Sequence, residues 1–591
     1  MSFPPVDNTS CSAADSDPLD VTRNIIDCDI ARLEESIRAR NELTNFSQHW
    51  PRILRSSALS RPTLRTNIAR LEERVRALKS RRNELSPISY LPVEILCKIF
   101  SLVEDNSIFC SGLSPESWTN FSHVSQHWRS SALSAPELWT NIPLSWPRWA
   151  QEMLIRSKMA TLTIRSDFSF DNSNSRVIET VRSCLYQMNR VGEIDIGMIA
   201  GMRLEQIFRY LPKSAPQLHT LCIDSPHFFG NAFSIHEDFL YDTGRLQRVE
   251  LINCKISWDS RLLTGLTRLT LEDSLKANSS IIQVLHALQR MPALNDLHLK
   301  DSIPDDSDGP LASAYPVVDL PYLRVLCISS GVGPLTTVLR HITFPHTAIL
   351  SLTCRENQSA QIDFSNFLSV LATKFLSSLV IRSLSLQVLD DSNSTHGLEF
   401  FLWTTAVIQD CFPSRLFSHS QLRLILKWPS ESTRLHNHKK ALTSAFDAMS
   451  LPFLTQLQLS TGNYIDSQTL VETFGQLHLL ERVCVLRNAS VSFLEALVYK
   501  TKAAEKSKTA YRTVSFPKLR YIHLVITAFD RCGLGSISVN MLLDCLMERC
   551  ERNAAVQVLR LDCYYISSDD VQRLKEIVVD VIWDDESRRL L

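Results

Sequence analysis

The chain has 591 residues, of which 44% are hydrophobic and 21% are charged. A chain of this length exceeds what one compact core can hold, so we expect two or more domains or an elongated repeat array. The 62 lysines and arginines are balanced by 63 aspartates and glutamates. This balance argues against a protein built mainly to bind nucleic acid or an anionic membrane.

The cysteine pattern and the first twenty residues indicate the cellular compartment of the protein. The 15 cysteines are scattered singly, without a CxxC pair or a regular framework, which is typical of reduced thiols in a cytosolic or nuclear protein. The first twenty residues are polar and do not resemble a secretory signal. No apolar run reaches the length of a membrane span. We therefore expect a soluble protein of the cytoplasm or nucleus.

The N-terminal part is predicted to contain a tail and two helices. Residues 1–25 are predicted to be disordered, because their first part is polar and rich in Ser and Pro. Apolar residues recur at a/d spacing from Ile26 to Ile37 and again from Ile68 to Leu78, which predicts two short coiled-coil-like helices. The second is placed at residues 69–85.

Part of this region repeats further along the chain. Residues 31–68 resemble a damaged copy of residues 69–142, since sequences such as Ala-Arg-Leu-Glu-Glu and Thr-Asn-Phe-Ser occur in both in the same order. The first copy lacks a counterpart of residues 91–103 and has Arg65 where the second has Trp139. We place a coiled-coil-like helix and this truncated duplicate at residues 26–68, and we expect residues 31–65 to be dispensable for binding.

The second helix also carries a basic face. Interleaved glutamates favour a solvated surface there, and nuclear import or nucleic-acid binding is the alternative. The cations of this face are Arg74, Arg76, Lys79, Arg81 and Arg82.

The densest motif runs from Ile88 to Val103. Pro92 and Glu94 suit the first turn of a helix, because proline needs no N–H partner there and a negative charge favours the N-terminal end of the dipole. The apolar residues that follow at helical spacing predict one wide apolar face. They are Leu91, Ile95, Leu96, Ile99, Phe100 and Val103.

A second helix is predicted just after this motif. Apolar residues step by three, three and four from Trp118 through Phe121 and Val124 to Trp128, which places them on one face. Pro136–Trp139 has the character of the first turn of a third helix.

These three segments resemble the F-box, in the order LPxEIL, IF, V, HWR and LW, and are similar to F-box proteins of filamentous basidiomycete fungi. The resemblance covers residues 86–142 and implies a small helical bundle that docks on a Skp-family adaptor and, through it, on a cullin. An ordinary helical hairpin whose aromatic residues fill a core is the alternative. The adaptor-binding residues carried over by this resemblance are Leu91, Pro92, Ile95, Leu96, Ile99, Phe100, Val124, Trp128 and Trp139.

Beyond Trp139 a short motif of the form LxxLxL returns many times. It resembles the strand of leucine-rich repeats in an irregular form. Stacked repeats of this kind share one continuous core and place their parallel strands along one wall. A compact domain of ordinary α/β strands is the alternative. Clear copies begin at Leu218, Leu246, Leu266, Leu294, Leu323, Leu454 and Leu519, and weaker ones at Met159, Val191, Ile381, Leu480 and Val556.

We therefore expect an α/β protein. An N-terminal helical segment and a small all-α bundle should be followed, over residues 143–591, by a leucine-rich-repeat-like solenoid with a curved parallel sheet.

Motifs for catalysis or cofactor binding are lacking. There is no GxxxxGK[ST] or GxGxxG sequence for phosphates. A calcium loop starting at Asp305 would place Pro316 where a bidentate Glu is needed. His436 and His438 have no third ligand at metal-binding spacing. We expect a protein that is not an enzyme and that binds no cofactor and no metal.

The two resemblances together predict the substrate-recognition subunit of an SCF-type E3 ubiquitin ligase. The alternative is a repeat scaffold without a ligase role. The target should contact residues between the last two apolar positions of each motif, which point away from the core. Their mixed polarity favours a protein target over nucleic acid or a membrane. These residues are Glu250, Thr270, His298, Gln458 and His523.

Overall fold

The computed structural model describes residues 18–46, 61–108, 119–144, 146–165, 175–197, 205, 208, 212, 214–225, 233–236, 239–240, 242–274, 279–305, 315–356, 362–391, 395–406, 420–429, 434–498, 514–528, 537–564 and 566–583. The chain divides into two compact units, Met1–Cys184 and Leu185–Leu591. None of the described helices is long and apolar enough to cross a membrane.

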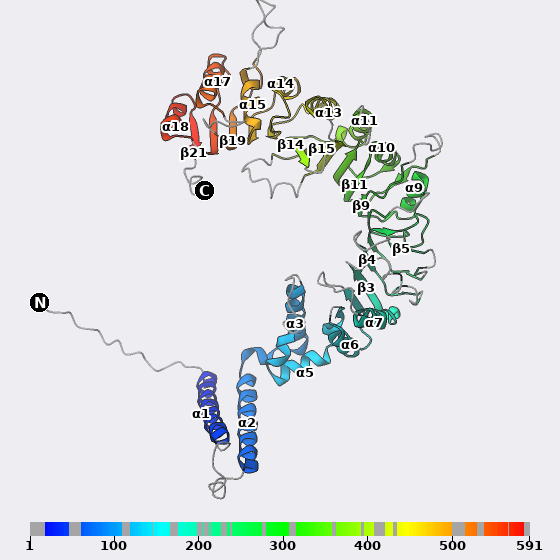
Figure 1. Ribbon diagram of the computed structural model, residues 1–591, viewed down its shortest axis with the longest axis vertical. Helices are drawn as coiled ribbons and strands as arrows, with labels where there is room; N and C mark the ends of the chain where they lie inside the picture. The colour runs from blue at the N-terminus through cyan, green and yellow to red at the C-terminus, as the bar shows by residue number, and fades with distance from the viewer. Residues whose placement is uncertain are drawn as a thin grey trace, which may run out of the picture. The chain divides into compact units, whose positions relative to one another are not determined.

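The first unit begins with two long helices, α1 (Pro18–Phe46) and α2 (Arg61–Glu84), which lie side by side (Figure 1). Ile26 and Ile30 of α1 are buried against Val75 of α2. Ion pairs join Lys79 to Glu34 at 2.7 Å and Arg82 to Asp27 at 3.1 Å. Because the later residue of α2 meets the earlier residue of α1, the helices are antiparallel. The residues packed along this seam are Leu33, Ile37, Leu78 and Leu85.

This helical pair corrects one expectation. Helix α1 begins at Pro18, so residues 18–25 are helical rather than part of a tail. The duplicated sequences also fold differently in the two copies. Thr66-Asn-Ile68 is helical within α2, whereas Asn141–Pro143 forms strand β1. The first is followed by Ala69 and good helix formers, while Pro143 excludes a continuous helix in the second. The described part of the first copy therefore belongs to a packed helical pair, and its dispensability for binding stays a prediction.

Replacing Ile30 with alanine should destabilise the pair of helices. Its side chain is buried, so the substitution removes apolar contacts and leaves a cavity, at a cost of about 2–5 kcal/mol. Hydrogen exchange of the full chain should then be faster across α1 and the facing part of α2. Ile25→Ala is the matched control, because Ile25 is exposed on the same helix. Equal exchange in the two variants would contradict this seam.

A small helical bundle follows, and its elements differ from the predicted second helix. A 3₁₀ turn ends at His123, Ser125 adopts an extended conformation, and the next helix begins at Gln126. The single helix expected through Val124 is therefore wrong, because Ser125 caps a new helix there. Trp118 lies outside the described residues. The elements of the bundle are η2 (Pro87–Tyr90), α3 (Val93–Ile108), η3 (Thr119–His123), α5 (Gln126–Ser134) and η4 (Pro136–Trp139).

A parallel strand pair completes the first unit. Strands β1 (Asn141–Pro143) and β2 (Leu162–Arg165) are joined through α6 (Pro147–Arg156). The guanidinium of Arg156 lies 4.4 Å from the ring centre of Trp139, which ties α6 to the bundle. The first two strands belong to the same compact unit as the bundle.

The second unit is a curved, mostly parallel sheet whose helices lie on one face (Figure 1). Its main strands are β3 (Val191–Ile196), β4 (Thr220–Asp224), β6 (Arg248–Ile252), β8 (Arg268–Glu272), β9 (Asp296–Lys300), β11 (Val325–Gly331), β13 (Ile349–Arg355), β14 (Ser383–Asp391), β15 (Thr395–Trp403), β16 (Leu422–Pro429), β17 (Gln456–Ser460), β18 (Arg482–Leu486), β19 (Tyr521–Ala528), β20 (Val558–Tyr564) and β21 (Asp580–Trp583). Two short parallel pairs are β5 (Phe233–Ser234) with β7 (Cys254–Lys255) and β10 (Val318–Asp319) with β12 (Ile342–Thr343).

Short helices alternate with these strands, as expected for a leucine-rich-repeat-like array. They are α7 (Ser175–Leu185), η5 (Met188–Arg190), α9 (Ile281–Gln289), α10 (Val332–His341), α11 (Ser365–Lys374), η8 (Leu376–Ser378), α13 (Arg434–Met449), α14 (Ser467–Phe474), α15 (Ala489–Val498), α17 (Val539–Glu551) and α18 (Ser568–Lys575).

The recurring motif sets the register of the sheet. Strands β4, β6, β8 and β9 each begin two residues after the first leucine of their motif. The fourth motif position of each strand pairs with that of the next, as in Leu221 with Val249 and Leu269 with Leu297. These side chains are buried on the helix-covered face. The predicted α/β fold with a parallel repeat sheet is confirmed.

An antiparallel insertion interrupts the parallel order. Strand β13 pairs with β16 instead of β14, and β16, β15 and β14 are antiparallel neighbours. Strand β14 then pairs with β17 in parallel. The apolar rows continue through the insertion, since Leu422 pairs with Leu350 and with Leu402, and Leu384 with Leu457. The spacing of the motif did not predict this reversal.

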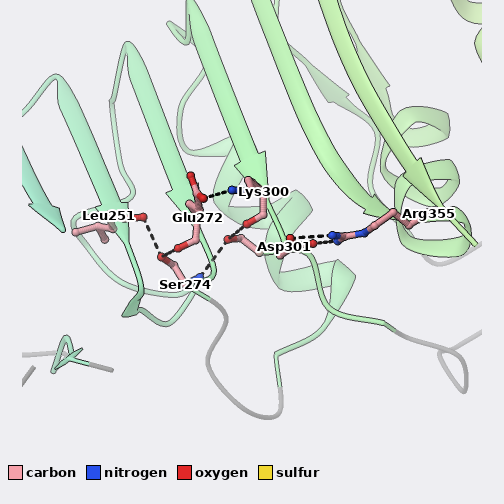
Figure 2. A network of polar contacts seen from close by, with 7 residues as sticks. Leu251, Glu272, Ser274, Lys300, Asp301 and Arg355 are labelled. Atoms are coloured by element: carbon pink, nitrogen blue, oxygen red, sulfur yellow. Dashed lines mark hydrogen bonds and ion pairs between the residues drawn. The ribbon is translucent and has the colours of Figure 1, made fainter. Parts of the chain in front are cut away.

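The ends of three consecutive strands share one turn. Asn253, Asp273 and Asp301 have φ of 54°, 48° and 51°, and each N–H donates to a carbonyl of the following strand. The Ser274 hydroxyl lies 2.9 Å from the Leu251 carbonyl oxygen, and its N–H donates to Ser302 Oγ at 3.2 Å. Figure 2 shows this chain of contacts, which continues through ion pairs of Lys300 with Glu272 and of Arg355 with Asp301.

Ser274→Ala should weaken this part of the sheet. Ser274 is buried, and removing its hydroxyl leaves the carbonyl of Leu251 without that donor, at a cost of about 1–3 kcal/mol. Hydrogen exchange should accelerate in β6 and β8. Ser369→Ala, at an exposed position of α11, is the control and should change stability by less than about 0.5 kcal/mol. Unchanged protection in the Ser274 variant would show that the turn does not depend on this hydroxyl.

Candidate functional site

Helix α3 carries two apolar stripes at neighbouring angles. Leu96 and Phe100 are 0% and 1% exposed and face the bundle. Ile95 and Leu102 are 49% and 51% exposed, and the partly buried Ile99 lies between them. Steps of four and three residues place Ile95, Ile99 and Leu102 on one side of the helix. The expected single apolar face is therefore divided into a buried and an exposed stripe.

The buried stripe is held by aromatic packing. The ring of Phe100 stacks on Phe121 at 4.3 Å between centroids and is tilted against Trp128 at 5.2 Å. Trp139 is fully buried, and its indole N–H donates to the carbonyl of Ala132 at 2.9 Å. Aromatic side chains bury large apolar areas, so these rings stabilise so small a bundle.

The nine predicted adaptor-binding residues accordingly fall into three groups. The exposed ones are Pro92, Ile95 and Val124. The partly buried ones are Leu91, Ile99 and Trp128. The buried ones are Leu96, Phe100 and Trp139. The last three are buried, so they hold the bundle together, whereas the motif by itself leaves open which of the nine residues touch a partner.

The sequence interpretation also missed exposed apolar residues of the bundle. Leu102 continues the stripe of Ile95 at a spacing of seven, a signal that was available in the sequence. Tyr90, which is 69% exposed, stands immediately before the Leu91-Pro92 pair. The other large apolar residues exposed on the bundle are Ile88, Val93, Val103 and Leu133.

Helix α2 is fastened to the bundle. The side-chain amide of Asn83 donates to the carbonyl of Val124 at 3.2 Å, and the Ser89 hydroxyl donates to the carbonyl of Asn83 at 2.5 Å. The N–H of Trp128 donates to Ser125 Oγ at 3.1 Å and so caps α5. The first two contacts join the end of α2 to Val124, next to η3, and to Ser89 of η2.

The bundle thus consists of a helix, a tight turn and two further helical turns around an aromatic core. This arrangement agrees with a known domain. Residues 88–145 match the family model described as F-box-like. No curated protein sequence is significantly similar to the chain. A chain in the crystal structure of the Rad7 and Elc1 complex in yeast is similar at 12% sequence identity and a TM-score of 0.28, over 73% of this chain and 94% of that chain.

Outside the F-box-like domain, the predicted target-binding residues divide between two halves of the sheet. Glu250, Thr270 and His298 point to the face without helices and are partly accessible. Gln458 and His523 are each 1% exposed, so their assignment as contact residues is wrong. Both residues lie on strands that have a neighbouring strand on each side. The motif predicts the direction of such a side chain but not its accessibility.

His523 has a polar partner within the sheet. Its Nε2 atom is 2.7 Å from a carboxylate oxygen of Asp562 on the neighbouring strand β20. This hydrogen bond is the main cause that lowers the pKa of Asp562 below its usual value. The pair is thus a contact that holds β19 to β20.

Within the residues described, no three His, Cys, Asp or Glu side chains are placed to hold a metal ion. His436 and His438 lie on helix α13 (Arg434–Met449). His438 is fully buried with its ring 5.0 Å from that of Trp428, whereas His436 is exposed. The two imidazoles therefore point in different directions.

Phe100→Ala should unfold the F-box-like domain, whereas Ile95→Ala should not. The buried ring packs on two other aromatic rings, so its loss costs about 3–5 kcal/mol. Truncating the exposed Ile95 should change stability by less than about 0.5 kcal/mol. Hydrogen exchange of α3 and α5 in the two variants measures the difference. Protection retained in Phe100→Ala would contradict the aromatic core described above.

Proposed function

We propose that this protein is the substrate-recognition subunit of an SCF-type E3 ubiquitin ligase, acting in the cytoplasm or nucleus and without a catalytic site of its own. The observation that supports this most is the F-box-like match at residues 88–145 on a bundle that exposes an apolar stripe. The family resemblance of the same residues implies docking on a Skp-family adaptor and, through it, on a cullin.

The exposed stripe of α3 is the proposed adaptor contact. Ile95 and Leu102 leave large apolar side chains in water, and covering such surface is favourable by about 25 cal/mol per Å². A row of apolar side chains at helical spacing is the pattern by which a helix is recognised in a groove of another protein. Pro92 and Val124 are exposed on the same domain and are proposed to extend this contact.

The repeat sheet is the proposed target-binding part. On strands β4 to β13 the outward side chains remain partly accessible, including Glu250, Thr270 and His298. On strands β14 to β19 the equivalent residues Ser385 and Gln458 are buried. We therefore place target recognition on the first half of the helix-free face. Holding a target lysine near a ubiquitin-loaded enzyme would raise the local concentration of the two reactants.

Ile95→Lys combined with Leu102→Lys should abolish adaptor binding without unfolding the domain. Both side chains are exposed, so lysine is tolerated in the free protein but opposes burial against a partner. We expect at least a tenfold loss of affinity for a Skp-family adaptor in a co-purification or calorimetric titration, by about 1.4 kcal/mol or more.

Ile155→Lys is the matched control, because Ile155 is exposed on α6 of the same unit but lies outside the stripe. It should leave adaptor affinity within about twofold. If wild-type protein does not retain the adaptor, the scaffold without a ligase role replaces this proposal. If the double variant binds as tightly as wild type, the adaptor contact lies elsewhere on the bundle.

A further inference from the structure

Strand β1 of the first unit and strand β21 of the second each pair with a single neighbour among the described residues. A strand of this kind presents a row of backbone N–H and C=O groups on its open side, and such a row pairs readily with a strand of another chain. Proteins usually shorten or interrupt the row for that reason. The two strands differ in this respect.

The open side of β1 is closed to further pairing. The strand has three residues, and Pro143 is the last of them. The N–H of Leu144 donates to the carbonyl of Arg165 on the β2 side, so position 143 faces the opposite side, where proline has no N–H to offer. Ile142 is fully buried. A short edge strand with proline is the protection that natural sheets commonly have.

Strand β21, at one end of the curved sheet (Figure 1), lacks this protection. The N–H of Asp580 donates to the carbonyl of Gln557, which precedes β20, at 3.0 Å. In a parallel ladder alternate residues bond to the same neighbour. The N–H and C=O groups of Val581 and Trp583 therefore point to the open side. Residues 579–583 contain no proline and no lysine that would interrupt this edge.

The same edge exposes apolar side chains. Val579, just before the strand, is 91% exposed. Val581 and Trp583 are half-buried, and they lie beside Leu559 and Leu561 of β20, which belong to the core under the helices. The core thus reaches the open side of β21 without a polar terminal repeat, which arrays of this kind need for solubility.

We propose that the open edge of β21 binds β21 of a second copy of the chain, as an antiparallel pair around a twofold axis at Val581. A twofold axis makes two identical edge strands antiparallel. Because the N–H and C=O of Val581 point outward, the two copies of this residue exchange both hydrogen bonds. Val579 then lies opposite Trp583 of the second copy. This inference does not depend on the proposed function.

The residues of this edge complement one another in that register. Val581 meets Val581, Val579 meets Trp583, and Asp580 meets Ile582, so no two like charges lie opposite each other. Branched and aromatic residues are those that stabilise cross-strand pairs. Val581 and Trp583 lie on the side of the sheet that the helices cover, so the pair joins the cores of the two copies. A second copy therefore fits both the backbone and the side chains of the edge.

The first test is the oligomeric state of the full chain, measured by sedimentation velocity from about 1 to 100 µM. We expect a dimer with Kd on the order of 10 µM, because two strands of five residues make a small interface. Val581→Pro should weaken it at least tenfold, since proline removes both central N–H donors. The N–H of Val581 makes no hydrogen bond among the described residues, so this proline should be tolerated as Pro143 is in β1. Val581→Thr keeps the N–H and should dimerise within about threefold of wild type.

Cysteine substitutions test the register. Two copies of Val581→Cys would have Cα atoms about 5.5 Å apart, which a disulfide can span. Val579→Cys is the matched control, because its two copies would lie about 14 Å apart along the strands, too far for a disulfide. We expect oxidation to produce a covalent dimer of Val581→Cys, and none of Val579→Cys or of wild type.

Hydrogen exchange distinguishes the other ways of covering this edge. The amides of Val581 and Trp583 should be protected more strongly as the concentration rises. A monomeric wild type with unprotected edge amides would overturn the inference. A monomer whose edge amides are protected at every concentration would overturn it in favour of another segment of the same chain.

The variants decide where a dimer is joined. A dimer that survives Val581→Pro and forms no disulfide through Val581→Cys has its interface elsewhere, and this also refutes the inference. Exchange in β20 checks that Val581→Pro remains folded. If it does not, the disulfide of Val581→Cys against Val579→Cys decides the question alone.

Discussion

The second unit depends on one constraint, the pairing of apolar residues at equivalent positions of neighbouring strands. A strand of five residues with one covering helix exposes most of its apolar side when alone. In the array, the fourth-position residue of each strand, such as Val249, lies between those of its two neighbours and is lost from solvent. Stability is therefore cooperative along the sheet, and each repeat owes its order to the adjacent ones.

The bundle solves a different problem with few residues. Its helices are short, so two stacked aromatic rings and a buried indole with a satisfied N–H replace the long apolar seams of a larger domain. In this arrangement the side chains of Leu96 and Phe100 pack in the core, whereas those of Ile95 and Leu102 on the same helix are exposed to solvent. Exposed apolar side chains on the second side of the helix lower the solubility of the free protein. Such a surface is typical of a site that binds another protein.

Much of this architecture could be predicted from sequence, because the decisive signals are local. The LxxLxL spacing fixes which side chains of Leu269 and Leu297 meet, and the Leu91-Pro92 pair marks the start of α3. The antiparallel insertion could not be predicted, since strand order depends on pairings that a single motif does not encode. A local signal also led to a wrong prediction. The apolar spacing indicated one continuous helix through Val124, but Ser125 follows the 3₁₀ turn and caps a separate helix.

Side-chain accessibility was the other quantity that sequence did not determine. Alternation along a strand gives the direction of His298 and of His523 equally well. Only the assembled sheet distinguishes them, since the first is partly accessible and the second is buried against Asp562. In the bundle the same holds for Trp139, whose place in the motif carries no information on whether it contacts a partner or fills the core.

The reversed order of β14 to β16 has a consequence for synthesis on the ribosome. Strand β13 ends at Arg355, and the strand that covers its free edge, β16, begins at Leu422. At about 5–20 residues per second, the nascent chain carries an open parallel edge for roughly 3–13 seconds. An edge of that kind pairs readily with other chains. The insertion therefore creates an interval in which a chaperone, or the folding of β14 and β15 nearby, has to protect the growing sheet.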